Sequence, residues 1–261
     1  ESGSFKEEVV PADMVAAVGA AREALIEMVA EADEKLMERF FEAGTLSDEE
    51  LVTGLRVATA SAKIFPVVCT SALINIGVPQ LLDAIVSMLP SPADRPYRGV
   101  TPDGTNVERM ADDKAPAGAF VWKTIADPFA GRITMFRVVS GTLKSDSTVH
   151  NKTKEAQERL GSLQLLQGKT PTAVPEIKAG DLGSVAKLKD TLTNDTLGDK
   201  ADPIVFPPIK FPEPVLAYAI EPKTRGDEDK ISTAMHRIEE EDPSIRYSRD
   251  PQTKELLLAG Q

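Results

Sequence analysis

Three short segments of the sequence imitate nucleotide-binding motifs. Residues 161–170, GSLQLLQGKT, end like a phosphate-binding loop, but six residues instead of four separate the two glycines and the pattern is strand-like. Residues 151–154, NKTK, imitate Asn-Lys-x-Asp, yet a lysine cannot accept the two guanine hydrogen bonds that the carboxylate accepts. Residues 195–198, DTLG, match Asp-x-x-Gly, which ordinary turns also produce. We therefore predict a strand, a failed motif and a turn, and no nucleotide site.

Residues that could bind a metal or act in catalysis are few. The chain has two histidines, His150 and His236, and one cysteine, Cys69, and these do not form a cluster or adjoin a nucleophile in sequence. The acidic run Glu239–Asp242 occupies consecutive positions, which point in different directions on a helix and cannot converge on one cation. We therefore predict no metal site, no catalytic residue, and a solvated helix end at the acidic run.

Charge and composition restrict the partners and the compartment. The formal net charge is −11 and the sequence pI is about 4.8, so phosphates are repelled at long range and any RNA contact must be a local patch. A single cysteine cannot form an intrachain disulfide, and the sequence shows no long apolar run and no signal-peptide pattern. We expect a cytoplasmic protein without membrane contact.

The elements that must position any site begin with helices. Apolar residues recur every three or four positions from Ala12 to Ala43, which predicts one amphipathic helix that stops at Gly44. Ser47 and Glu50 form a Ser-x-x-Glu capping box, which predicts the start of a second helix over 48–63. A helical pair therefore opens the chain.

An α/β pattern follows the helical pair. The apolar run Ile64–Cys69 predicts a strand that is buried on both faces, and Pro79 suits the first turn of a helix that ends near Leu89. Because one strand cannot make a sheet, we expect the rest of that sheet upstream of Glu1.

Short apolar runs separated by turns extend from Gly118 to about Gly198, a spacing typical of a small β-barrel. Prolines between 203 and 214 predict a stiff connector. After it, residues 215–258 show a strand, a helix and two strands, a βαββ order that stops abruptly and so suggests truncation at this end as well.

Eight segments, taken in order, resemble the elongation factor G family of translational GTPases. None is specific alone, but they are collinear over nearly the whole chain, and the series is highly specific. They are Thr70–Leu73 with Asn75 and Gly77, Leu89–Pro92, IADPFAGR at 125–132, FRVVSGTL at 136–143, Ala179–Leu182, FPEPV at 211–215, IEPKTR at 220–225 and Glu241–Ser244.

The resemblance implies a multidomain fold, α/β plus all-β plus α+β. Residues 1–89 would be the C-terminal part of a P-loop GTPase domain, including helices of an insertion. Residues 97–205 would be the translation-factor β-barrel, domain II, and residues 214–261 the start of a ferredoxin-like domain III.

The resemblance also bears on nucleotide binding. Ser71, Ala72 and Leu73 would form the fifth GTPase motif, whose backbone amide reads the guanine oxygen. Ile74 and Ile76 stand where the family usually has lysines, so both a housekeeping translocase and a divergent elongation-factor-G-like paralogue stay open. The other nucleotide motifs are missing, and we expect this chain to be inactive and to hold no cofactor. GTP and Mg²⁺ would belong to the longer parent protein.

As to function, the resemblance implies an elongation factor that promotes GTP-dependent translocation of tRNA and mRNA, to which this monomeric chain contributes ribosome-contacting domains. Alternatives are a stand-alone, non-catalytic ribosome- or RNA-binding module, or a piece of a related ribosome-protection or release-factor GTPase. The partner would be small-subunit rRNA and protein. Basic residues of the barrel either face that rRNA or are ordinary solvated charges. They are Arg132, Arg137, Lys144, Lys152, Lys154 and Arg159.

Overall fold

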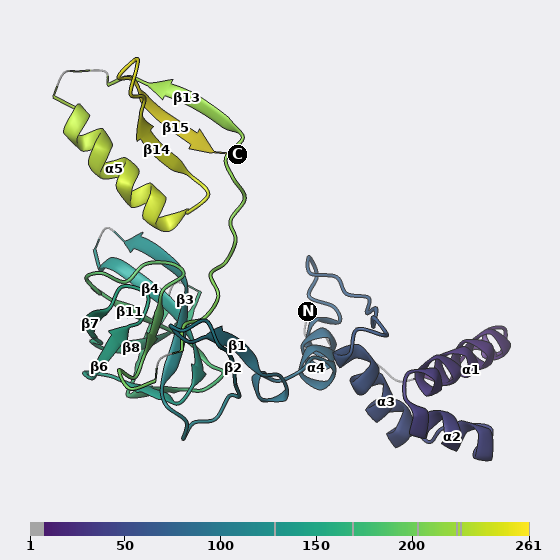
Figure 1. Cartoon of the computed structure of the whole chain (residues 1–261). Helices are drawn as coiled ribbons and strands as arrows, with labels where there is room; N and C mark the ends of the chain where they lie inside the picture. Colours follow the sequence, from purple (N-terminus) through teal and green to yellow (C-terminus); the bar gives the residue numbers. More distant parts are fainter. Residues whose placement is uncertain are drawn as a thin grey trace. The chain divides into compact units, whose positions relative to one another are not determined.

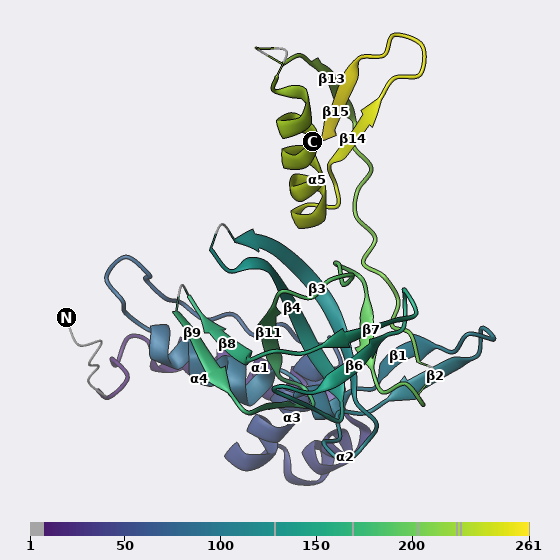
Figure 2. The same ribbon diagram turned by 90° about the vertical axis from the view of Figure 1, so that its left-hand side faces the viewer.

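The computed structural model describes residues 8–127, 129–168, 170–202, 204–222, 224 and 226–260. The chain forms two compact units, which divide between Ser91 and Pro92 (Figure 1). The first unit is helical, and the second combines a β-rich domain with a smaller α+β domain, as a second view shows (Figure 2). In the described part of the chain, no helix is both long enough and apolar enough to cross a membrane.

The helical unit has a break where one helix was predicted. Asp33 interrupts the run from Ala12 to Ala43, because its side chain accepts hydrogen bonds from the amides of Lys35 at 3.0 Å and Leu36 at 3.2 Å and so caps a new helix. The stop at Gly44, which has a φ of 71°, is confirmed. The helices are α1 (Val15–Glu31), α2 (Glu34–Ala43) and α3 (Asp48–Ala60).

The capping box predicted at the start of α3 is formed. The Ser47 hydroxyl accepts from the Glu50 amide at 3.3 Å, and a Glu50 carboxylate oxygen accepts from the Ser47 amide at 2.8 Å. Gly54 lets α3 approach α1, since a Cβ at this position would lie 2.4 Å from Val29 Cγ1. The three helices thereby enclose a small core of Ile26, Val29, Ala30, Leu46, Leu51, Ala58 and Ile64.

The segment after α3 contains no strand. Residues 64–70 have no ladder partner among the residues that the structure describes, and of these seven residues only Ile64 is buried. The strand predicted at Ile64–Cys69 is therefore wrong here, because a strand needs a neighbour to receive its backbone hydrogen bonds. Helix α4 (Val78–Met88) follows, with Pro79 in its first turn as predicted, and none of its residues is buried.

The β-rich domain begins after a short 3₁₀ turn, η1 (Pro92–Asp94). Short strands separated by turns fill the region from Gly118 to Gly198, as predicted. The strands are β1 (Tyr97–Val100), β2 (Asn106–Arg109), β3 (Gly118–Asp127), β4 (Gly131–Ser140), β5 (Thr142–Lys144), β6 (Thr148–Asn151), β7 (Ala156–Arg159), β8 (Leu163–Gln167), β9 (Thr170–Val174), β10 (Glu176–Lys178), β11 (Leu182–Ala186) and β12 (Thr196–Gly198).

Eight of these strands share one antiparallel sheet, in the order β7-β6-β12-β3-β4-β11-β8-β9. Strands β10 and β5 pair separately, as do β1 and β2. The domain is β-rich as predicted, but within the described residues no ladder joins β7 to β9, so closure into a barrel is not found. Its core contains Val121, Phe136, Val138, Leu160, Leu163, Val185 and Leu197, each with an exposed fraction of 0%.

A connector links the β-rich domain to the α+β domain. Within the connector, Ile209 exchanges hydrogen bonds with the Asn194 side chain at 2.8 and 3.2 Å, and Pro203 lies outside the described residues. The predicted βαββ order is then confirmed, in a sheet of order β13-β15-β14. Its elements are β13 (Leu216–Ile220), α5 (Glu228–Glu241), β14 (Arg246–Arg249) and β15 (Leu256–Gly260).

Candidate functional site

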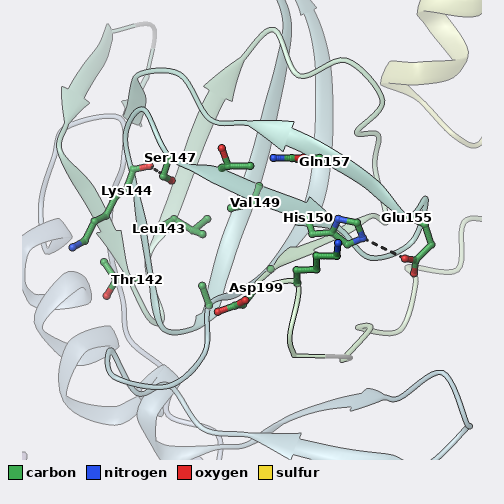
Figure 3. Close-up of a pocket in the computed structure, with 13 residues that line it drawn as sticks. Thr142, Leu143, Lys144, Ser147, Val149, His150, Glu155, Gln157 and Asp199 are labelled. Carbon is green, nitrogen blue, oxygen red and sulfur yellow. Dashed lines mark hydrogen bonds and ion pairs between the residues drawn. The ribbon is translucent and has the colours of Figure 1, made fainter.

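A cavity of about 530 Å³ opens on the β-rich domain between β5, β6, β7 and the turn at residues 198–200 (Figure 3). Leu143 and Val149 are buried below it, with exposed fractions of 2% and 7%. Polar groups also line the wall, among them the hydroxyls of Ser147 and Thr148 and the amide of Gln157. This composition suits a polar ligand that makes several hydrogen bonds above an apolar floor.

The two ends of the cavity differ in charge. Lys144 lies at one end, and the pair of His150 and Glu155 at the other (Figure 3), with 3.2 Å between His150 Nε2 and Glu155 Oε2. The Ser147 hydroxyl fixes the Lys144 end, because it donates to the Lys144 carbonyl at 2.6 Å. The cationic end could therefore hold an anionic group, while Glu155 disfavours one at the opposite end.

Arg159 belongs to the same face as Lys144. It pairs across the β6–β7 ladder with Thr148, which lines the cavity, and paired residues of an antiparallel ladder project to the same side. Arg159 and Lys144 are both exposed, and neither side chain has a hydrogen bond or ion pair in the described part of the chain. Two of the six predicted RNA contacts thus lie on one face and have unused side-chain donors.

The other four basic residues are engaged by the protein itself. Arg137 Nε donates to the Gly180 carbonyl at 3.3 Å, and its guanidinium lies 5.6 Å from the centre of the Tyr97 ring. Lys152 Nζ donates to the Lys200 carbonyl at 2.8 Å. Lys154 Nζ lies 3.2 Å from Asp195 Oδ2, and Arg132 is held by Glu240 and by the Lys189 carbonyl. The structure does not gather the six residues into one patch.

The segment that imitates Asn-Lys-x-Asp has a structural role. Asn151 is fully buried, and its Oδ1 accepts from the amides of Thr153 at 3.1 Å and Lys154 at 3.0 Å, which closes the turn after β6. Its Nδ2 donates to Asp195 Oδ2 at 2.8 Å. The asparagine therefore ties two turns together, and its donors and acceptor are occupied.

The other two imitations are also parts of the sheet. The segment predicted as a turn at 195–198 contains strand β12, preceded by the buried Asp195, so that prediction is corrected. The ladder on both sides of β12 explains the difference, because strands β3 and β6 both pair with it. Residues 163–167 form β8 as expected, and Lys169 lies outside the described residues.

The acidic run is not a solvated helix end. Glu239 accepts a hydrogen bond from the Tyr247 amide, Glu240 pairs with Arg132, and Glu241 accepts from the Ala126 amide. Asp242 accepts from the amide and the hydroxyl of Ser244 at 3.0 and 2.6 Å. The four carboxylates diverge, as their consecutive positions predict, and each of them therefore meets a different protein partner.

The loop predicted to read guanine is a tight, exposed turn. Ser71 and Ile76 exchange backbone hydrogen bonds at 2.9 and 3.1 Å, and Leu73 has an exposed fraction of 95%. The Ala72 amide has no hydrogen-bond partner within the described residues. This turn can offer one backbone donor. In the described part of the chain, no group of three or more His, Cys, Asp or Glu is arranged to hold a metal ion.

Sequence reasoning missed most of the cavity wall. Thr142, Ser147, Thr148, Gln157 and Lys200 come from elements that meet only through the strand pairing. For these residues, the sequence offered one signal, the alternation of outward and inward residues in Thr148–Asn151. It places Val149 toward the core and His150 toward the cavity.

Comparison with known proteins agrees with the order of the domains. The family described as elongation factor G domain 2 matches residues 116–200, and that described as Elongation Factor G, domain III, matches residues 211–261. This chain also resembles a protein from Thermus thermophilus whose crystal structure is known. The two share 30% sequence identity, and the match has a TM-score of 0.82 and covers 100% of this chain. This chain spans 37% of the length of that solved chain. Because two successive domains of one family match in order, the chain belongs to the elongation factor G family and carries its domains 2 and III.

Proposed function

We propose that this chain is part of a translation elongation factor that promotes GTP-dependent translocation on the ribosome. Its β-rich domain would contact small-subunit rRNA at the cationic end of the cavity. The succession of domains 2 and III supports the assignment to a translation factor. The observation that carries the contact is the pair Lys144 and Arg159, two cations on one face with no protein partner among the described residues.

The charge of the chain favours a local contact between the cations of the cavity face and rRNA. With a formal net charge of −11, the chain as a whole repels phosphate, and long-range attraction cannot bring RNA to it. Two cations on one face, beside hydroxyl groups, can still hold one or two backbone phosphates at short range. Such binding is weak and sensitive to salt, which suits a factor that must leave the ribosome after each cycle.

The proposal assigns GTP and Mg²⁺ to the longer protein. The turn of Ser71, Ala72 and Leu73 offers a donor of the kind expected near guanine, through the Ala72 amide. The described residues contain no group of three or more His, Cys, Asp or Glu that could hold a metal ion, and the proposal gives this chain no catalytic step.

The proposal is tested with small ribosomal subunits over a salt series. The variant Lys144→Glu/Arg159→Glu should bind more weakly, and its slope of log affinity against log salt should be smaller by about one to two units, because each phosphate contact contributes somewhat under one unit. Loss of binding should be largest at low salt, where counterion release is most favourable.

A matched control is Arg98→Glu/Arg246→Glu. These exposed residues lie outside the cavity lining and already pair with Glu108 at 3.3 Å and Glu213 at 3.8 Å, so the control changes the formal charge equally without touching the cavity. The two variants should differ clearly. Equal affinities and equal slopes would remove the cavity from ribosome binding and contradict the proposal.

A further inference from the structure

The carboxylates at the end of α5 meet two residues that face each other across the β3–β4 ladder. Ala126 pairs with Arg132 in that ladder. The Ala126 amide donates to Glu241 Oε1, and Arg132 donates through Nε, at 3.2 Å, and through Nη2 to the two carboxylate oxygens of Glu240. The contact therefore combines a two-point arginine–carboxylate pair with a backbone hydrogen bond to a charged acceptor, both of which are strong types.

The charge pattern of α5 makes this contact important for the helix as well. Three glutamates occupy its last turn, where the helix dipole is negative, and no basic residue of the helix lies there to offset them. Positive charge comes from the β-rich domain instead, through Arg132 and through Lys123 on β3. Hydrogen bonds from the Ser244 hydroxyl and amide lower the pKa of Asp242, and the charge of Lys123 adds to this effect.

Arg132 has little capacity left while α5 is in place. Its Nη1 donates to the Lys189 carbonyl at 2.7 Å and its other nitrogens serve Glu240, so its side chain is only 24% exposed. An external phosphate that binds through Nε and Nη2 would have to replace Glu240, because both use that same edge of the guanidinium.

We propose that the acidic end of α5 is an electrostatic latch that occupies Arg132, so that docking of α5 and capture of a phosphate oxyanion by Arg132 exclude each other. Release of α5 then frees Arg132 as a further cation of the β-rich domain. The latch itself depends only on the contacts described above, whereas RNA as the source of the phosphate rests on the proposed function.

The latch is tested on the whole chain, without RNA, by the reactivity of Arg132. In Glu240→Gln, modification of Arg132 by phenylglyoxal, followed by peptide mass spectrometry, should be faster by about tenfold, the change in equilibrium that loss of a charge-assisted pair produces. Hydrogen exchange at the Ala126 amide should accelerate in the same variant. Unchanged values of both quantities would overturn the latch.

Glu239→Gln is the matched control. It removes the same charge from the same helical turn, but its partner is the Tyr247 amide of the α+β domain, so it should leave Arg132 reactivity unchanged. An equal rise in both variants would mean that helix fraying, and not the latch, governs Arg132. Trp122 fluorescence reports whether the β-rich domain stays folded. Arg132→Lys keeps the charge but loses the two-point geometry, and it should also accelerate exchange at Ala126.

A separate measurement tests whether Arg132 contacts rRNA after the release of α5. If Arg132 reaches rRNA on release, Glu240→Gln should bind small subunits several-fold more tightly than the wild type, and Glu239→Gln should not. A reactive Arg132 together with unchanged affinity would refute Arg132 as a phosphate contact and leave the latch standing. Failure of the cavity variant Lys144→Glu/Arg159→Glu to weaken binding would contradict the proposed function alone.

Discussion

The β-rich domain and the segment from Ile64 to Ser91 are both rich in apolar residues, but they differ in what covers those residues. In the domain, Phe136 and Val121 have exposed fractions of 0%. In the segment, Phe65 is 77% exposed and Val67 is 90% exposed. The same residue types therefore lie in a close-packed core in one region and on the surface in the other.

The difference comes from hydrogen-bonded neighbours. Strand β3 is paired on both sides, by β4 and by β12, although β12 lies about seventy residues further along the chain. Residues 64–70 have no such neighbour in the described part, and the only bridge nearby is the turn of Ser71 with Ile76. A continuous apolar run thus becomes a strand only where another strand satisfies its backbone, and burial follows from that pairing.

The largest expected effect is on a core residue of the β-rich domain. Phe136→Ala should reduce the free energy of unfolding of that domain by about 3–5 kcal/mol, because it removes a buried ring and leaves a cavity. Urea unfolding followed by Trp122 fluorescence measures this, since Trp122 lies on β3 and is the only tryptophan of the chain.

Phe65→Ala provides the other side of the comparison. The same truncation at a ring that is 77% exposed should change the free energy of unfolding of the helical unit by no more than about 0.5 kcal/mol, as measured by far-UV circular dichroism. A loss of several kcal/mol at Phe65 would show that the segment has a core in solution and would break the comparison.

A smaller effect is expected where a buried charge organises a loop of the β-rich domain. Glu158 is 3% exposed, and its carboxylate accepts hydrogen bonds from the amides of Lys189, Asp190 and Thr191 at 2.8–3.1 Å and from the Thr191 hydroxyl at 2.8 Å. Glu158→Gln should cost about 2–3 kcal/mol in the free energy of unfolding, because hydrogen bonds to a charged acceptor are the strong kind.

The pH dependence of that cost has a definite sign. Burial raises the pKa of Glu158, but the hydrogen bonds from residues 189–191 outweigh it and hold the pKa below its ordinary value of 4.5. The stabilisation is therefore present above the pKa of the unfolded chain and is lost as the pH falls through the lower pKa of the folded state. The difference between wild type and Glu158→Gln should shrink as the pH falls below about 4.5. A constant difference down to the acid transition would contradict this account.

The same contrast explains what sequence could predict. The sequence predicted structure correctly where the pattern that determines it is local, as at the capping box of Ser47 and at the βαββ order after residue 215. Asp33 was missed because the apolar periodicity continues across it, although its cap is as local as that of Ser47. The family resemblance predicted the order of the domains, and separate family models match two of these domains, domain 2 and domain III.

Long-range contacts set the limit for the site. Nothing near Arg132 in sequence indicates that Glu240 takes its guanidinium, because the two residues meet only when α5 lies against the end of the β3–β4 ladder. Lys144 and Arg159, by contrast, keep unused donors within the described residues because no partner reaches them. Which basic residues are available to a ligand therefore depends on the packing of distant elements, and charge in the sequence does not determine it.

Among the changes that are expected to destabilise, the smallest tests the local side of the comparison, in the helical unit. Ser47→Ala removes the acceptor for the Glu50 amide and should lower the free energy of unfolding of that unit by about 1 kcal/mol. Ser47→Thr keeps a hydroxyl at the cap and should retain most of the stability, so far-UV circular dichroism of the two variants separates the effect of the cap from the effect of side-chain size.

The backbone amide and the hydroxyl of Ser47 lower the pKa of Glu50. The contribution of the capping box to stability should therefore fade as the pH falls through that lowered pKa. Because the box lies within four residues of sequence, neither variant should alter the β-rich domain, and a shift in the Trp122 transition would show that the two units are coupled more tightly than their separate cores indicate.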